Sequence, residues 1–318
     1  MASSATVRQV ARPLLTAFPS AIPKTEIRLF AMRPGIHRKN RGIFILIFSL
    51  TFASLTIVQA ASDWKSLAPG MDYKYVVAKT PSPVGDSRIF ILRMDPSLWQ
   101  LEAIGISQTG ESSGHTARDW SARHKFSAAI NAGMFATDMK THLGYMASST
   151  HTNNSHQNNY QSVAAFEPRD SKSIPKFCIF DLDAPEVHFA DIQKNYTSAL
   201  QNLRLIKRPG TNQWSRQDRQ WSEAALGEDD AGRILFIYSR SPFSMHDLNN
   251  ELLSAGIGLV AAQHLEGGPE AQLYLHVGNV EMEMYGSYET SFRENDSNSS
   301  AWPVPNILGA RPRLHAVQ

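Results

Sequence analysis

Two apolar runs in this chain each end in a polar side chain that is soon followed by glycine. Residues 258–262 (GLVAA) indicate a buried strand and lead into Leu265-Glu266-Gly267-Gly268-Pro269-Glu270. Residues 127–130 (SAAI) lead into Asn131-Ala132-Gly133 in the same way. Glycine adopts backbone angles closed to other residues and lets a ligand approach the main chain. The two corners therefore predict either two halves of one binding site, with Glu266 and Asn131 as polar groups, or two ordinary tight turns.

The first 60 residues differ from the rest of the chain in charge and hydropathy. They carry eight of the 31 Lys and Arg residues but one of the 29 acids, which leaves a net charge of −5 for the remainder. Basic residues precede the apolar run 43–58, and small residues at its end suit signal peptidase. We therefore expect a secretory signal peptide within residues 1–60, a mature chain beginning near Ala61 or Ser62, and a periplasmic or secreted protein. An uncleaved N-terminal anchor is the alternative, although the run is short for a membrane span.

The remainder of the chain is mildly acidic and lacks the excess of basic residues that binds nucleic acid, so we expect no nucleic-acid partner. Membrane contact is expected only during export. Cys178 is the only cysteine, so no internal disulfide is possible and the fold must depend on core packing. This combination favours a bacterial periplasm or exterior.

Short strand-like runs dominate the sequence after residue 60 and predict an α+β fold, a mixed β-sheet with flanking helices in a single domain. Residues 61–123 are expected to pack as N-terminal strands and a helix on a main domain of residues 124–318. Thr116 and Ser244 are placed to cap helices at 117–125 and 245–254. The strand–helix–strand order across residues 233–265 favours parallel pairing.

Several motifs, taken in order, point to a known family. Residues 131–135 (NAGMF) resemble an N-(G/A)-G-(F/M)-F element, and residues 263–268 (QHLEGG) resemble an N-L-D-G-G element. Residues 143–146, 225–227 and 245–253 match a glycine turn, a central glycine and a helix between them. Over residues 124 to 311 the chain thus resembles the phosphodiester glycosidase domain family. That family includes a lysosomal enzyme that removes N-acetylglucosamine from phosphate diesters.

The resemblance implies a glycoside hydrolase that cleaves a sugar-1-phosphodiester bond in an envelope or extracellular glycan. Its substrate partner would be a carbohydrate or sugar phosphate. The family's aspartate is Glu266 here, and an arginine common before the central glycine is absent in register. A non-catalytic glycan-binding or polysaccharide accessory protein is therefore kept as the alternative.

Cleavage of a glycosidic bond usually requires a carboxylic acid and a second group that acts as base or nucleophile. Glu266 is the expected catalytic carboxylate, and Asn131 is the expected hydrogen-bonding partner beside it. The second group is left open among Asp138, Asp247 and Glu270.

Five further residues are expected to bind the substrate. Arg240 follows a buried strand and can grip phosphate bidentately, whereas His246 lies in the first turn of a helix where an anion can bind. The other three are the corner glycines Gly133, Gly267 and Gly268.

Residues 110–114 (GESSG) match the G-x-S-x-G pattern of serine hydrolases and make Ser112 a second alternative. Such an elbow should follow its strand immediately, but residues 107–109 intervene. The sequence has no HExxH or CxxC spacing, so we expect no metal or cofactor, while a loosely held divalent cation stays open.

Overall fold

Alternating side chains make the largest sheet a partition between two apolar cores. In the computed structural model, which describes residues 63–170 and 172–314, strand β3 (Arg88–Met94) buries Phe90 and Leu92 on one face. On the other face it buries Ile89 and Ile91. Successive strand residues point to opposite faces, so a strand covered on both sides needs an uninterrupted apolar sequence.

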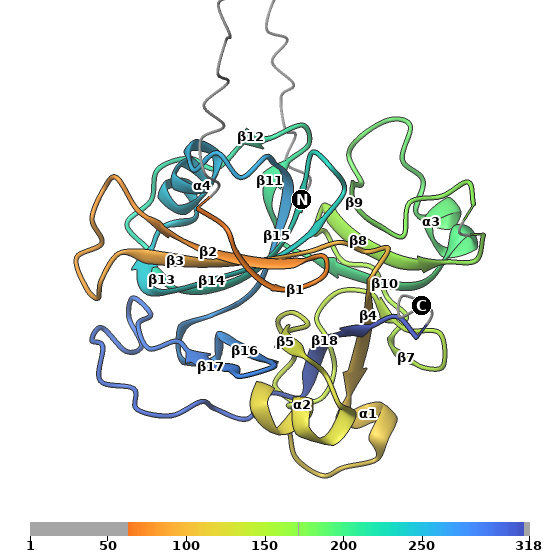
Figure 1. The fold of residues 1–318 in the computed structure, drawn as a ribbon, viewed down its shortest axis with the longest axis horizontal. Helices are drawn as coiled ribbons and strands as arrows, with labels where there is room; N and C mark the ends of the chain where they lie inside the picture. Colours follow the sequence, from red (N-terminus) through yellow and green to blue (C-terminus); the bar gives the residue numbers. More distant parts are fainter. Residues whose placement is uncertain (1–62, 171, 315–318) are drawn as a thin grey trace, which may run out of the picture. The chain divides into compact units, whose positions relative to one another are not determined.

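The strands of the described residues form three sheets (Figure 1). The largest has the order β1-β2-β3-β14-β13-β15-β11-β12. Besides β3 it contains β1 (Lys65–Ala68), β2 (Met71–Val77), β11 (Arg204–Lys207), β12 (Thr211–Asn212), β13 (Trp221–Asp229), β14 (Ile234–Phe243) and β15 (Leu259–Gly267).

Two five-stranded sheets complete the architecture. The order β17-β16-β5-β18-β4 combines β4 (Trp99–Gly105), β5 (Ala128–Asn131), β16 (Gln272–Val277), β17 (Val280–Tyr285) and β18 (Asn306–Pro312). The order β7-β6-β10-β8-β9 combines β6 (Met146–Ala147), β7 (Thr152–Asn154), β8 (Ser162–Pro168), β9 (Phe177–Asp181) and β10 (Tyr196–Asn202). One core cluster joins all three sheets, with Phe236, Ile130 and Phe166 among its buried members.

The helices are few and short. They are α1 (Ile106–Thr109), α2 (Ala117–His124), α3 (Phe189–Asn195), α4 (Met245–Ser254) and the 3-10 turn η1 (Gly268–Glu270). The α+β class and the single domain are confirmed, since the described residues belong to one compact unit.

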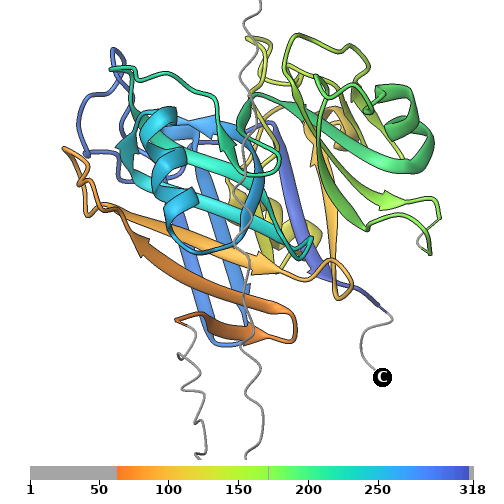
Figure 2. The same ribbon diagram turned by 90° about the horizontal axis from the view of Figure 1, so that it is seen from above.

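Both predicted helix caps are present. The hydroxyl oxygens of Thr116 and Ser244 each accept a hydrogen bond at 3.1 Å, from the backbone N–H of Asp119 and Asp247 respectively. Helix α4 lies against the largest sheet (Figure 2), where Leu248 and Leu252 join the second core cluster. No helix among residues 63–170 and 172–314 is long and apolar enough to cross a membrane. The expected signal peptide lies outside the described residues.

The expected parallel pairing is wrong. Strands β14 and β15 flank α4 in sequence, but β13 lies between them and pairs antiparallel with both. The strand–helix–strand unit therefore spans one intervening strand instead of placing its two strands side by side. All the ladders of the described residues are antiparallel, so the sheet is not mixed in its pairing.

Candidate active site

The two glycine corners predicted from the sequence meet through Asn131. Its Nδ2 donates to the carbonyl oxygen of Glu270 at 2.9 Å, and its Oδ1 accepts from the backbone N–H of Gln272 at 2.7 Å. The side chain is 1% exposed. Both polar atoms of the Asn131 amide thus hold the turn after β15, and Asn131 does not line the adjacent pocket.

A pocket of about 420 Å³ opens beside this junction. Its wall combines one histidine, three carboxylates, a tryptophan and several apolar side chains. The lining residues are Met134, Phe135, Leu143, Leu203, Trp221, Met245, His264, Glu266, Gly267, Glu270 and Glu289.

Glu266 lies at the end of β15 and projects into this pocket. Desolvation raises the pKa of its carboxyl to about 8, against the Coulomb attraction of His264 and a hydrogen bond from the N–H of Gly267 to Oε1 at 3.1 Å. Glu270 carries a raised pKa as well, again mainly through burial. At neutral pH Glu266 is therefore a protonated acid, able to donate a proton.

A buried ion pair, His264 with Glu223, lies close enough to Glu266 to act on its charge. His264 Nδ1 lies 2.6 Å from Glu223 Oε1, and Trp221 Nε1 donates to Glu223 Oε2 at 2.7 Å. Burial alone lowers the pKa of His264, but the charge and hydrogen bond of Glu223 outweigh it and the net shift is upward. Glu223 was not predicted from the sequence. Strand β13 also contains Glu228 and Asp229, so an acid in this strand is no signal by itself, and the partner of Glu223 depends on the pairing of β13 with β15.

A side chain at either of the two glycines after Glu266 would collide with a neighbouring residue. A Cβ at Gly267 would meet the Trp221 ring at 2.7 Å. Gly268 has a φ of +61°, and a Cβ there would meet Glu289 Oε2 at 2.7 Å. Gly133 has a φ of +146°, and a Cβ there would collide with Asn202 and His142 behind the pocket. Gly267 lines the pocket, and the other two shape its surroundings.

Glu289 was also missed by the sequence analysis. It belongs to the irregular segment after β17, which is held against the start of β13 by the bond from Ser222 N to Tyr288 O at 2.9 Å and by a bridge between Trp221 and Glu289. No local pattern marks such a segment, because its place depends on contacts with a strand more than 60 residues earlier.

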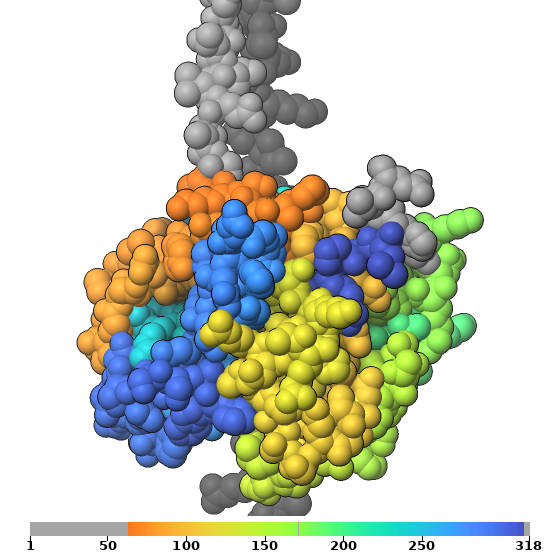
Figure 3. Space-filling model, turned by 60° about the horizontal axis from the view of Figure 1, so that its bottom comes forward, coloured from red at the N-terminus to blue at the C-terminus, as the bar shows by residue number. Residues whose placement is uncertain are grey.

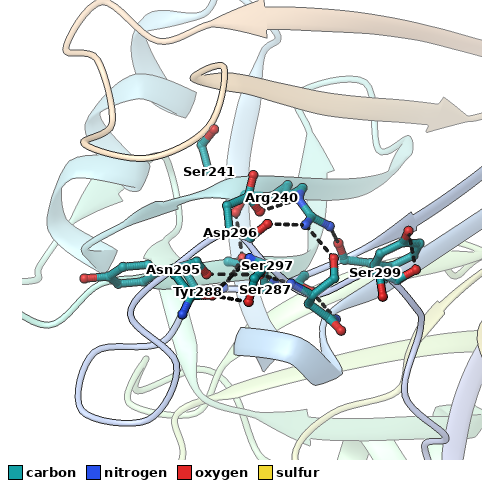
Figure 4. Close-up of polar contacts among 12 residues, drawn as sticks. Arg240, Ser241, Ser287, Tyr288, Asn295, Asp296, Ser297 and Ser299 are labelled. Atoms are coloured by element: carbon teal, nitrogen blue, oxygen red, sulfur yellow. Dashed lines mark hydrogen bonds and ion pairs between the residues drawn. The ribbon is translucent and has the colours of Figure 1, made fainter.

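Arg240 lies outside the pocket and is engaged with the chain itself (Figure 4). Its Nε donates to Asp296 Oδ1 at 2.5 Å, and its other nitrogens donate to the carbonyl oxygens of Tyr285, Asp296 and Asn298. The guanidinium thus holds the segment that carries Glu289 in place. Arg240 and Tyr238 line a separate cavity of about 260 Å³. The structure does not bring Arg240 to Glu266.

His246 and two of the three candidate second carboxylates also lie elsewhere. His246 Nδ1 is 2.9 Å from Asp247 Oδ1, and Asp247 accepts a hydrogen bond from the Ser244 hydroxyl at the start of α4. Asp138 accepts from Thr141 in an exposed loop. Of the three candidates, Glu270 is the one that shares the pocket with Glu266.

Ser112 does not occupy a strand-to-helix elbow. It follows α1 rather than a strand, and its hydroxyl makes no hydrogen bond to any histidine of the described residues. No group of three His, Cys, Asp or Glu side chains in residues 63–170 and 172–314 is arranged to hold a metal ion.

Comparisons with known proteins identify the family and the fold of this chain. The phosphodiester glycosidase family model matches residues 124–311, more than half of the chain. The catalytic domain of zebrafish N-acetylglucosamine-1-phosphodiester alpha-N-acetylglucosaminidase, auto-inhibited by its pro-peptide, has a similar fold. The TM-score is 0.55 at 14% identity, and the match covers 80% of this chain and 87% of that chain.

A second structure shows the same fold. A hypothetical protein from Synechocystis matches with a TM-score of 0.52 at 13% identity, over 80% of this chain and 64% of that chain. A search of curated proteins finds no match. From the extent of the family match we conclude that the chain belongs to the phosphodiester glycosidase family.

Proposed function

We propose that this protein is a glycosidase that hydrolyses the bond between the anomeric carbon of a sugar and a phosphodiester oxygen. Water adds to the anomeric carbon, the C1–O bond to phosphate breaks, and the products are the free sugar and a phosphate monoester of the aglycone. The observation that carries the proposal is Glu266, a desolvated carboxylic acid with a pKa of about 8, beside the carboxylate of Glu270 in one pocket.

The two carboxyl groups suit different roles. Glu266 keeps its proton at neutral pH and donates it to the departing phosphate oxygen. Glu270, once ionised, is the group that activates water or attacks the anomeric carbon. Because a phosphodiester is already a good leaving group, we expect the acid to contribute at the lower end of the range for such catalysis, about 100-fold.

The buried pair of Glu223 and His264 acts on Glu266 through its charge. A protonated His264 draws the pKa of Glu266 down, while the Glu223 carboxylate pushes it up. The pair therefore shifts the pKa of Glu266, and of its two members only His264 lines the pocket.

One observation supports a second candidate, a sugar-binding protein without turnover. The residues that line the Glu266 pocket include no Lys or Arg, although a phosphodiester carries a negative charge. Trp221 and Phe135 in the same wall offer apolar ring surface to a sugar.

The deciding experiment uses a panel of sugar 1-phosphodiesters and measures release of reducing sugar. We expect turnover by the wild-type protein and a loss of about 100-fold or more in kcat for Glu266→Gln. Glu186→Gln, which alters an exposed carboxylate away from the pocket, is the matched control. Binding without turnover in the wild type would favour the sugar-binding candidate, and full turnover by Glu266→Gln would remove that residue from the mechanism.

We further propose that the protein is exported by a signal peptide in residues 1–60 and acts on a glycan of the cell envelope or exterior. The support is the basic, apolar and small-residue order of that segment. N-terminal sequencing of protein recovered outside the cytoplasm tests it. A start near Ala61 or Ser62 agrees with cleavage, and an intact start points to the anchored alternative.

A further inference from the structure

A second pocket adjoins the first and shares one carboxylate with it. It has a volume of about 580 Å³ and includes Glu270 in its wall. Its other lining residues are Ile106, Glu111, Ser112, Ser113, Gly114, Asp138, Met139, Lys140, Trp302, Pro303 and Pro305. The two pockets therefore adjoin at Glu270.

Unused hydrogen-bond donors line this second pocket. Within the described residues, the hydroxyls of Ser112 and Ser113 and the Nζ of Lys140 make no hydrogen bond or ion pair. Gly114 lets the serine loop lie close to residue Val304, since a Cβ at Gly114 would meet the Val304 carbonyl at 2.5 Å. Two hydroxyls and an ammonium group are suitable donors for a phosphate, for which the Glu266 pocket offers no Lys or Arg.

Apolar side chains line the same pocket. Trp302, Pro303 and Met139 line the pocket, and the Phe292 ring meets the Trp302 ring edge-on with centroids 6.2 Å apart. Phe292 is 63% exposed and Met139 is 52% exposed, which places them among the most exposed large apolar side chains of the described residues. Exposed apolar groups concentrated at one place mark a binding surface.

Hydrogen bonds hold the segments that carry Trp302 and Lys140 in place. Gln272 donates through Nε2 to the carbonyl oxygens of both Glu270 and Trp302, and its Oε1 accepts from Ala117 N at 2.9 Å. Asn153 donates to the carbonyl oxygen of Lys140 at 3.1 Å and so holds that loop in place. The segment after β17, which leads to Trp302, lies beside the surface formed around α2 in Figure 3.

We propose that the second pocket is the site for the phosphate and an apolar aglycone of the substrate. The proposal rests on the function proposed above and narrows its substrate class. The sugar lies at Glu266, the phosphate lies past Glu270 near Lys140 and the two serine hydroxyls, and an apolar group on the second alcohol packs against Trp302. The serine of the G-x-S-x-G pattern, Ser112, then donates a hydrogen bond to the phosphate and is not a nucleophile.

Binding of reaction products tests this without requiring turnover. The probes are methyl phosphate and 3-phenylpropyl phosphate, titrated calorimetrically into the full chain. We expect the phenylpropyl ester to bind about tenfold tighter or more, because its ring buries apolar surface that the methyl ester lacks. Trp302→Ala should abolish this preference, while Tyr75→Ala, which removes an exposed aromatic ring elsewhere, should leave it unchanged.

Lys140 is tested with the same probes. Lys140→Gln should weaken both esters by a similar factor, whereas Lys194→Gln, at an exposed position on α3, should weaken neither. Equal affinity of the two esters for the wild type, or a preference that survives Trp302→Ala in a protein of unchanged melting temperature, overturns the proposal.

Turnover of the matching sugar 1-phosphate diesters separates this proposal from the general one. If the methyl diester is cleaved but the phenylpropyl ester shows no binding advantage, the glycosidase function stands and the aglycone site fails. If no diester is cleaved but the binding preference is found and depends on Trp302, the aglycone site stands and the glycosidase function fails.

Discussion

His264 Nδ1 and Glu223 Oε1 lie 2.6 Å apart in an almost fully buried pair at the base of the Glu266 pocket. Removing one partner of such a pair leaves an uncompensated buried charge, which costs far more than removing both. We expect His264→Gln to lower the free energy of unfolding by about 3 kcal/mol. The double variant Glu223→Gln/His264→Gln should recover much of that loss. Denaturant unfolding of Glu223→Gln, His264→Gln and the double variant measures the coupling, and strictly additive losses would show that the pair contributes no interaction energy.

Glu266 should impose a pH dependence on both activity and stability. Its pKa of about 8 lies above its unfolded value of 4.5, so the folded state binds the extra proton between these values. The stabilisation of the folded state by this proton has its full value below about pH 4.5 and is lost progressively as the pH rises to about 8. The acid form required for catalysis is lost above pH 8, so kcat/KM should fall about tenfold per pH unit there.

Glu266→Gln separates the effect of this residue on stability from that of other groups. Its melting temperature should fall less between pH 5 and pH 8 than that of the wild type. Thermal melts of the two proteins in matched buffers measure the difference. Parallel melting curves across that range would mean that Glu266 titrates as an ordinary surface carboxyl.

Gly268 and Gly278 form a matched pair for testing the turn after β15. Both have a positive φ, +61° and +57°, but a Cβ at Gly268 would meet Glu289 whereas one at Gly278 would meet open space. Alanine should cost about 1 kcal/mol of backbone strain at either position. Only Gly268→Ala should also displace Glu289 and reduce kcat. Equal activity of the two variants would show that the contact with Glu289 is not needed.

The sequence predicted the local elements of this fold well, because capping residues and apolar runs act over a few positions. Thr116 and Ser244 marked the starts of α2 and α4, and the strands next to the two glycine corners begin within one residue of the predicted positions. The pairing of β14 with β15 was predicted wrongly, since nothing local to that segment shows that the preceding strand, β13, lies between them in the sheet.

The site was predictable only in part for the same reason. Glu266 and its glycines are adjacent in sequence, so their pattern was visible. Glu223 reaches His264 through strand register, and Glu289 reaches the pocket through a long irregular segment; neither leaves a local pattern. Arg240 was expected to follow the end of its strand, but it lies within β14, and its guanidinium is engaged by Asp296 and by backbone carbonyls of the segment after β17.

Asn131 tests how far the catalytic turn depends on one buried amide. Asn131→Asp keeps an oxygen that can accept from Gln272 N but loses the donor to the carbonyl of Glu270. It also buries a carboxyl where an amide was neutral. We expect a loss of about 2 kcal/mol in the free energy of unfolding and a lower kcat through displacement of Glu270. A variant with normal stability but a raised KM would instead indicate direct contact between Asn131 and the substrate.

Arg240 distinguishes a positioning role from direct phosphate binding. Arg240→Gln removes the ion pair to Asp296 and the bonds to the carbonyl oxygens of Tyr285 and Asn298. Hydrogen bonds to a charged group contribute about 1.5–3 kcal/mol each where they are buried, and less at this half-exposed site. We expect a loss of about 1–2 kcal/mol in stability and faster proteolysis of residues 286–300, because the segment is then held to the rest of the chain mainly by its bonds to Gln220 and Ser222.

The kinetic signature of Arg240→Gln decides between the two roles. If Arg240 only positions the segment that carries Glu289, kcat falls moderately while KM for a sugar phosphodiester changes little. If Arg240 grips phosphate, KM rises sharply and the rise is larger at low ionic strength, where charge attraction is least screened. Arg88→Gln is the matched control, since Arg88 lines the same cavity but pairs with Asp86 rather than with the segment after β17. A large rise in KM for Arg240→Gln alone would mean that the arginine leaves Asp296 and reaches the substrate during the reaction.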